Sequence, residues 1–133
     1  MRILLDAMGG DNAPLEIIKG AVQAAADESI ELVLIGREEE MKKCIADNGI
    51  TLPGNVTLVH ADGVVTMEDD PIKVVKERSD SSMITGLHML KDGEVDAFIS
   101  AGSTGALMTA ATLIVKRIKG IRRAAIAIEF PTA

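Results

Sequence analysis

The stretch ELVLIG at Glu31–Gly36 decides the fold class, because it has the length of a strand and almost only apolar side chains. A strand with one face in water alternates polar and apolar residues, whereas a strand covered on both faces is apolar throughout. A similar short run at Arg2–Asp6 precedes it, and the amphipathic segment Pro14–Ala26 lies between the two. Strand, helix and strand in this order predict a parallel unit with helices covering the sheet.

The same alternation of apolar runs and amphipathic segments continues to the end of the chain. It predicts further helices at Arg37–Asn48, 70–78, Ser81–Lys91 and Thr104–Arg117, and strands at Val56–His60, Val95–Ser100 and Ala124–Phe130. We therefore expect an α/β fold with a mainly parallel sheet and helices on both faces, as a single domain over residues 1–133. No returning helix follows the fifth expected strand, so we expect the chain to be part of a longer protein.

Composition excludes several classes of protein. The 133 residues carry 14 Lys and Arg against 20 Asp and Glu, and a formal net charge of −6 does not suit binding along a nucleic-acid backbone. The two aromatic residues, Phe98 and Phe130, provide no stacking platform for bases. One cysteine permits no internal disulfide, and no apolar run has the length of a membrane span. These features predict a soluble, cytoplasmic domain.

Glycine-rich and polar segments follow three of the expected strands. These segments are Asp6–Pro14, His60–Thr66 and Ser100–Ala106. The carboxyl ends of parallel strands share one edge of the sheet, and α/β proteins bind ligands outside that edge. The sequence therefore predicts a binding site where these three segments meet.

The segment Gly102-Ser103-Thr104-Gly105 directly precedes an apolar helix. Its backbone N–H groups and hydroxyls, placed at a helix N-terminus, are suited to an oxyanion such as phosphate. An ordinary helix cap with a tight turn explains the same residues equally well. The segment has neither the Walker A pattern nor the dinucleotide fingerprint, so nucleotide binding is disfavoured.

The first of the three segments holds two carboxylates and a pair of glycines. Gly9 and Gly10 indicate either a turn with positive φ or a backbone that approaches a ligand closely. Asp6 and Asp11 are able to bind a metal, orient a proton or cap the following helix. Capping by Asp11 or Asn12 is the favoured interpretation.

Residues that serve as nucleophiles or metal ligands are sparse. Cys44 lies on the apolar stripe of its expected helix, which favours core packing, and His88 is expected at the surface. His60, at a strand end, is the better placed histidine, but one Cys and two distant His give no zinc spacing. Ser81 and Ser82 are favoured as helix caps over phosphate ligands. No metal or cofactor is therefore expected.

Charge is distributed unevenly along the chain. Residues 1–75 carry six cationic and fourteen anionic side chains, and residues 76–133 carry eight and six. Five of these eight cations form a basic cluster: Lys116, Arg117, Lys119, Arg122 and Arg123. Cations at the C-terminal end of a helix are one explanation, and a docking surface for an acidic partner is the other.

Together these segments resemble the bacterial phosphate acyltransferases, the PlsX family of fatty acid and phospholipid synthesis proteins, and the chain is similar to their N-terminal portion. The segments that carry the resemblance are MRILLDAMGGDNAP (Met1–Pro14), DGVVTMEDDP (Asp62–Pro71), Ser81–Met83, DAFISAGSTGALMT (Asp96–Thr109) and the closing Arg117–Thr132. Two positions depart from the family pattern: Ser103 stands where Asn is usual, and Arg123 where Pro is usual. If the usual Asn contacts substrate, Ser103 is expected to alter affinity or rate.

The resemblance implies a reaction, a fold and partners. A long-chain acyl group passes from acyl carrier protein to inorganic phosphate, without a cofactor, and the acyl phosphate then goes to a membrane glycerol-3-phosphate acyltransferase. The implied fold is the three-layer α/β/α sandwich of the isocitrate/isopropylmalate dehydrogenases, in a homodimer. The implied location is the cytoplasm, with a peripheral position at the inner face of the membrane as an alternative.

The resemblance also implies roles for the candidate residues. Phosphate or the oxyanion of the reaction is expected at a catalytic loop made of Gly102, Ser103, Thr104 and Gly105. The facing wall is expected to consist of Asp6, Gly9, Gly10, Asp11 and Asn12. Further donors are Ser81 and Ser82, and the expected contacts for the acidic carrier protein are Lys119, Arg122 and Arg123.

Two alternatives stay open at this point. A coenzyme A thioester in place of acyl carrier protein would make the protein a phosphotransacetylase-like transferase. Alternatively, the 133-residue chain is a half-domain that binds phosphate or carrier and is inactive without the rest of the cleft.

Overall fold

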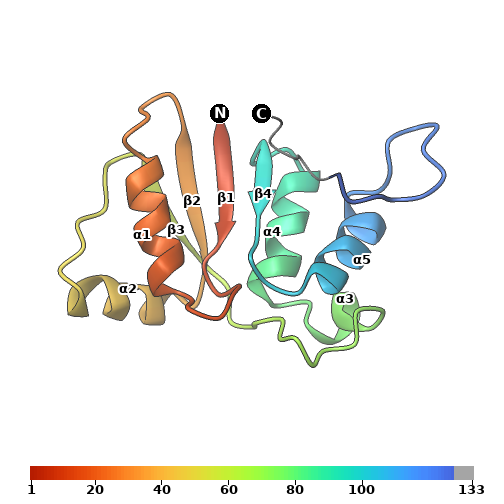
Figure 1. Cartoon of the computed structure of the whole chain (residues 1–133), viewed down its shortest axis with the longest axis horizontal. Coiled ribbons are helices and arrows are strands. Elements are labelled where there is room, and N and C mark those ends of the chain that lie inside the picture. The colour runs from red at the N-terminus through yellow and green to blue at the C-terminus, as the bar shows by residue number, and fades with distance from the viewer. Residues whose placement is uncertain (128–133) are drawn as a thin grey trace, which may run out of the picture.

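The computed structural model describes residues 1–127, and at its centre lies β2 (Glu31–Gly36), a strand with a parallel neighbour on each side. Within residues 1–127 the sheet has four parallel strands, in the order β3 (Val56–His60), β2, β1 (Arg2–Asp6) and β4 (Ala97–Ile99) (Figure 1). Every residue of Leu32–Gly36 is buried. The apolar strand that the sequence predicted is therefore covered on both faces.

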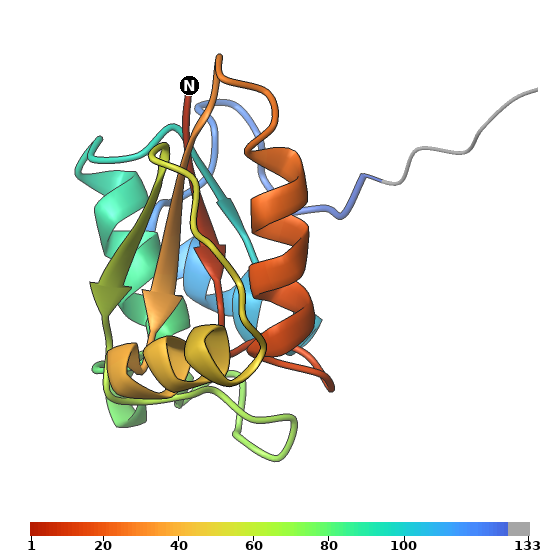
Figure 2. The ribbon, with the colours of Figure 1, turned by 90° about the vertical axis from the view of Figure 1, so that its left-hand side faces the viewer.

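Five helices accompany the sheet in the described residues: α1 (Leu15–Ala24), α2 (Glu38–Asp47), α3 (Val74–Glu77), α4 (Ser82–Lys91) and α5 (Thr104–Ile114). α1 and α4 lie on opposite faces of the strands (Figure 2), α2 lies with α1, and α5 packs against α4. The side chains of β2 alternate between the two faces. Leu32 and Leu34 belong to the core under α1 and α2, whereas Val33 and Ile35 belong to the core on the α4 side. The expected three-layer α/β/α arrangement is confirmed.

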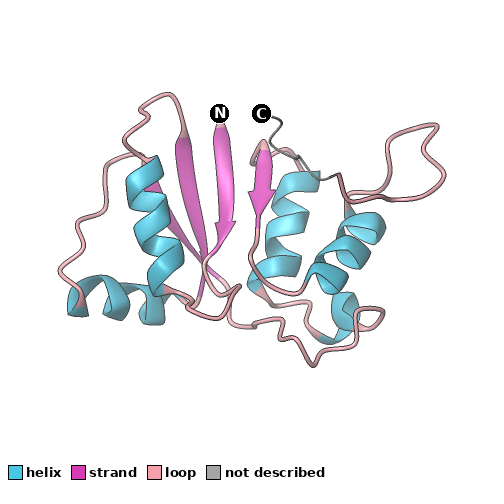
Figure 3. Ribbon diagram, in the orientation of Figure 1, coloured by secondary structure: helices cyan, strands magenta, loops and turns pink. Residues whose placement is uncertain are grey.

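The strands all run in one direction, so the loops that follow them emerge at one edge of the sheet. This edge is the lower one in Figure 3, where the loops after β1 and β4 approach the N-terminal ends of α4 and α5. The three polar segments of the sequence lie at this edge.

The structure differs from the expectation beside β4. No strand forms at residues 124–127, and the other part of the expected strand Ala124–Phe130, residues 128–130, lies outside the described residues. A strand needs a backbone partner, and β4 pairs only with β1 in the described part of the chain. For residues 124–127 the prediction of a fifth strand is therefore wrong. β4 and α3 are also shorter than the expected Val95–Ser100 and 70–78.

α5 ends at Ile114 instead of continuing to Arg117. Lys116 has a φ of 73°, and its N–H donates to the carbonyl oxygen of Ala111 at 3.0 Å, which closes the helix in a left-handed turn. None of the helices in residues 1–127 combines the length and apolar character that a bilayer span requires.

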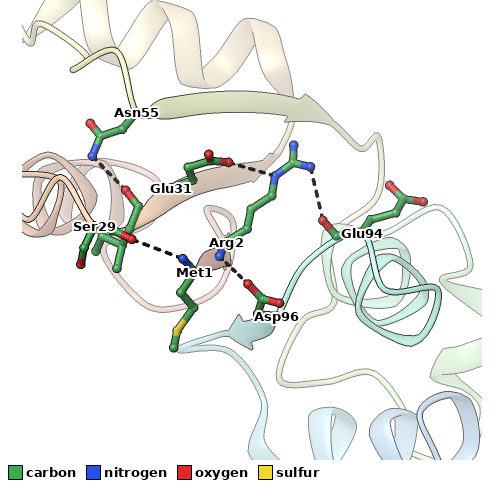
Figure 4. A network of polar contacts seen from close by, with 8 residues as sticks. Met1, Arg2, Ser29, Glu31, Asn55, Glu94 and Asp96 are labelled. Carbon is green, nitrogen blue, oxygen red and sulfur yellow. Dashed lines mark hydrogen bonds and ion pairs between the residues drawn. The ribbon is translucent and has the colours of Figure 1, made fainter.

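A polar network holds the opposite, amino-terminal edge of the sheet (Figure 4). The Met1 amine donates to the Ser29 carbonyl oxygen at 3.2 Å, and the Arg2 N–H donates to Asp96 Oδ2 at 2.7 Å. The Arg2 guanidinium donates to the Glu94 carbonyl oxygen at 3.3 Å. These contacts join β1 to the loops that enter β2 and β4, so they help to keep the strands in register and their carboxyl ends aligned.

Candidate functional site

The loops that leave β1 and β4 touch each other, because these two strands are paired neighbours in the sheet. Their contact is at Gly9, where an added methyl group would lie 2.8 Å from Ser100 Oγ and 2.9 Å from the Gly102 nitrogen. Gly10 has a φ of 109°. The predicted turn with positive φ is therefore at Gly10. The predicted close approach of the backbone is at Gly9, and the group it approaches is the loop after β4.

The Asp6 carboxylate at the end of β1 is 3% exposed and is surrounded by hydrogen-bond donors. Its Oδ1 accepts from the Met8 N–H at 3.1 Å and from the Ser82 hydroxyl at 2.6 Å. Its Oδ2 accepts from the Ser100 hydroxyl at 2.8 Å, and Ser100 Oγ accepts in turn from the Gly102 N–H at 3.1 Å. Both oxygens of Asp6 are thus engaged within the protein. Ser100 was not among the predicted site residues.

The glycine-rich segment forms the N-terminal end of α5. Ser103 is 7% exposed, and its Oγ accepts from the Ala106 N–H at 3.3 Å, so the helix-cap interpretation is confirmed for Ser103. Thr104 and Gly105 are exposed in the first turn, where backbone N–H groups have no carbonyl acceptor four residues back. The two amides and the Thr104 hydroxyl are therefore the donors that this segment presents to an anion.

The third polar segment meets the others at the start of α4. Ser81 is fully buried, and its Oγ accepts from the Ile84 N–H at 3.3 Å, which confirms it as a helix cap. Gly63 forms an isolated parallel bridge with Ser81, and its carbonyl oxygen accepts from the Ser82 N–H at 3.1 Å. The Ser82 hydroxyl points to Asp6. Both serine hydroxyls are thus buried and bonded to other groups of the protein, where they hold the start of α4 and the Asp6 carboxylate in place.

Asp11 and Asn12 are exposed at the same edge, and their predicted capping role is wrong. α1 has Pro14 as its N-cap residue and no side-chain capping bond, while the Asn12 carbonyl oxygen accepts from the Glu16 N–H at 3.2 Å. A capping side chain must stand directly before the first helical residue, which here is Leu15. Both side chains of the predicted pair are too early in the chain for that position.

The loop between β3 and α3 continues from the third polar segment to the start of α5, and the sequence patterns above did not identify this continuation as part of the site. Pro71 lies there, 3.5 Å from where a methyl group on Gly105 would stand. Asp69 Oδ2 accepts from the Thr66 N–H at 2.7 Å, and Asp69 Oδ1 accepts from Arg78 Nε at 2.9 Å. The Thr66 backbone N–H, helped by the Arg78 guanidinium, lowers the pKa of Asp69 below its ordinary value. The ionised carboxylate therefore stabilises the loop beside Gly105.

The histidines and the cysteine lie apart from these contacts. Exposed His60 at the end of β3 is 2.9 Å from Asp62 Oδ1 through Nε2, and its Nδ1 accepts from the Glu38 N–H at 3.3 Å. His88 is exposed, as expected. Cys44 is half-buried against the core under α1 and α2, so its predicted packing role is confirmed.

An apolar groove of about 540 Å³ lies beside α5. Residues of α4, β4, α5 and the following loop line it, including Leu87, Leu90, Phe98, Leu107, Met108 and Ile121. Thr104 also lines the groove, which therefore reaches the first turn of α5. The sequence patterns did not reveal this groove, although the apolar residues beyond α5 were one available signal: Ile118 is 80% exposed.

The basic cluster lies mostly on the exposed loop that follows α5. Lys119, Arg122 and Arg123 are exposed there, and Arg117 Nη1 donates to the Arg122 carbonyl oxygen. No cation occupies the last turn of α5. The helix-end explanation therefore does not hold for Lys119, Arg122 and Arg123, whereas Lys116 and Arg117 directly follow the C-cap residue Val115.

Comparison with known proteins relates the chain to one family. The family model described as "Fatty acid synthesis protein" matches residues 1–133. A phosphate acyltransferase of Dictyoglomus turgidum is 46% identical over 132 residues, which are 99% of this chain and 39% of that protein. One from Thermoanaerobacter pseudethanolicus is 48% identical over 133 residues, again 99% of this chain and 39% of the relative. The chain thus spans about 39% of the length of these curated relatives.

Proposed function

Because the chain belongs to the fatty acid synthesis protein family, we propose that it forms part of an enzyme that transfers a long-chain acyl group from acyl carrier protein to inorganic phosphate. The observation that carries this proposal is the match along the chain to proteins named phosphate acyltransferase. The products are an acyl phosphate and the free carrier thiol.

The donors of the α5 N-terminus support the phosphate half of the reaction. Phosphate is already an anion at neutral pH, so it needs positioning and desolvation more than deprotonation. The exposed amides of Thr104 and Gly105 and the Thr104 hydroxyl hold it, with the favourable dipole of α5 behind them. A phosphate oxygen then attacks the thioester carbonyl carbon, and the C–S bond breaks.

The leaving group needs little help in this reaction, because a thiol has a pKa of about 8.5 and departs as the thiolate. The carbonyl oxygen gains negative charge in the transition state and needs fixed donors. The loop of Gly102–Gly105, held by the Ser103 cap and by the Gly102 hydrogen bond, offers such a rigid set. The chain's own part in the reaction is therefore to orient two reactants and to stabilise an oxyanion.

The apolar groove supports the acyl half. Its volume of about 540 Å³ and its aliphatic lining suit a hydrocarbon chain. Thr104 belongs both to this lining and to the phosphate donors. An acyl chain in the groove would thus place its carbonyl carbon near the phosphate.

Phosphate-dependent release of carrier thiol from a long-chain acyl carrier protein tests the function. We expect release by the full-length protein, and a rise in the phosphate KM of about fivefold to tenfold in its Thr104→Val variant, because one hydroxyl donor is lost. The 133-residue chain is assayed in parallel. A folded full-length protein that releases no thiol contradicts the proposal. Release from acyl coenzyme A but not from acyl carrier protein supports the phosphotransacetylase-like alternative.

The exposed basic loop is the proposed contact for acyl carrier protein, which is acidic. Reversing the charge with Arg122→Glu and Arg123→Glu is expected to raise the KM for acyl carrier protein by about threefold to tenfold and to flatten its dependence on salt. The phosphate KM should stay constant. The matched control reverses Lys19 and Lys43, exposed cations on α1 and α2. Equal effects of the two double variants would show that net charge, and not this loop, governs carrier binding.

A further inference from the structure

Ser100, directly after β4, links two parts of the site through one hydroxyl group. Its Oγ lies 3.1 Å from the Gly102 nitrogen and 2.8 Å from Asp6 Oδ2. A backbone N–H only donates and a carboxylate oxygen only accepts hydrogen bonds. The Ser100 hydroxyl therefore accepts from Gly102 and donates to Asp6, and its rotor has a single orientation.

The anchor of this chain of hydrogen bonds is rigid. Asp6 is buried at the end of β1, and its other oxygen accepts from Met8 and Ser82. The relay from the Gly102 N–H through Ser100 to Asp6 thus ties the start of the glycine-rich segment to a central strand of the sheet.

The tethered amide sits two residues before the first turn of α5. Because Gly102 lacks a side chain, its backbone can adopt many conformations. The hydrogen bond from the Gly102 N–H to Ser100 restricts the backbone to one of them. The direction of the Thr104 and Gly105 amides depends on the path of the backbone at Gly102. Loss of the Ser100 hydroxyl frees this path, and ordering the loop around an anion then costs conformational entropy.

We propose that Ser100 is a positioning residue that orients the α5 N-terminus for phosphate. It does so through its hydrogen bonds to Asp6 and Gly102, without touching phosphate itself. The inference rests on the proposed function, because it takes phosphate as the ligand of this loop. It adds a residue to which the sequence patterns gave no individual role, and it gives Asp6 a role through Ser100.

The test compares Ser100→Ala with Ser100→Thr, which keeps a hydroxyl, in the full-length protein. Calorimetric titration with inorganic phosphate is expected to show about fivefold to tenfold weaker binding for Ser100→Ala, and recovery of most of the affinity for Ser100→Thr. In the thiol-release assay the same variants should change the phosphate KM more than kcat. If the Ser100 hydroxyl only stabilised the fold, Ser100→Ala would lower the melting temperature and leave the phosphate affinity of the folded protein constant.

A structural control separates these effects. Asn55→Ala removes two hydrogen bonds, to the Ala25 and Ile30 carbonyl oxygens, at the opposite edge of the sheet. We expect a lower melting temperature for this variant and wild-type phosphate affinity. Equal phosphate affinities for wild type and Ser100→Ala overturn the inference, as does a wild type that binds no phosphate or a Ser100→Thr variant that recovers nothing. Phosphate binding with this pattern but without thiol release contradicts the proposed reaction alone.

Discussion

A Gly9→Ala substitution is expected to lower the phosphate-dependent activity of the full-length protein by about tenfold to 100-fold, because a small displacement of binding groups has effects of that size. The new methyl group would lie 2.8 Å from Ser100 Oγ and 2.9 Å from both Asp6 Oδ2 and the Gly102 nitrogen. None of these three atoms is free to retreat. All three belong to the hydrogen-bonded relay, and the Gly102 nitrogen is also part of the backbone.

The measurement is kcat and the phosphate KM, with circular dichroism to establish that the variant is folded. Gly54→Ala is the matched control, since a methyl group there meets no atom within 4 Å and Gly54 lies in the loop before β3, away from the site edge. We expect wild-type kinetics for the control. A folded Gly9→Ala protein with the same kinetics would mean that the contact between the two loops has no part in catalysis.

A Gly86→Ala substitution in α4 is expected to destabilise the fold by about 1–3 kcal/mol, the usual cost of overpacking a core. Its methyl group would lie 2.5 Å from Phe98 Cε2 and 2.9 Å from Leu4 Cδ2, so α4 approaches the sheet at a distance that only glycine permits. In an exposed helix the same substitution stabilises, because alanine has the higher helix propensity by about 1 kcal/mol. The expected change in the free energy of unfolding therefore has the opposite sign to the change that helix propensity alone would produce.

Gly20→Ala in α1 tests this contrast. Gly20 is exposed, and a methyl group there meets nothing within 4 Å. We expect a gain of about 0.5–1 kcal/mol in the free energy of unfolding, measured by urea denaturation of each variant. A gain of similar size for Gly86→Ala would show that α4 has room to move away from Phe98 and Leu4.

The sequence predicted the central strands well. β1, β2 and β3 have the expected bounds, because each is a short apolar run with polar or turn-forming residues on both sides. The expected strand Ala124–Phe130 has similar composition, yet residues 124–127 form no strand. The pattern of apolar residues indicates that a segment is suited to a sheet. It does not indicate whether a partner strand is available.

The candidate site was predictable to the level of loops. Parallel strands bring their carboxyl ends to one edge, so the sequence predicted that the segments after β1, β3 and β4 share that edge. The pairing of β1 with β4, which brings two of these segments into contact, came only from the structure. The helix-cap roles of Ser81 and Ser103 followed from their position at the start of an expected helix. The capping role of Asp11 or Asn12 failed because it depended on the exact start of α1.

Local patterns in the sequence were sufficient for the α/β class, the parallel direction of the sheet and the edge at which a ligand would bind, since neighbouring residues along the chain produce the periodicities on which these depend. Tertiary structure alone decided which side chains act together. Ser82 and Ser100 reach Asp6 across 76 and 94 residues of chain. The groove beside α5 likewise forms from α4, β4 and α5 together. Such contacts depend on how strands and helices pack in space, and no spacing within one segment encodes them.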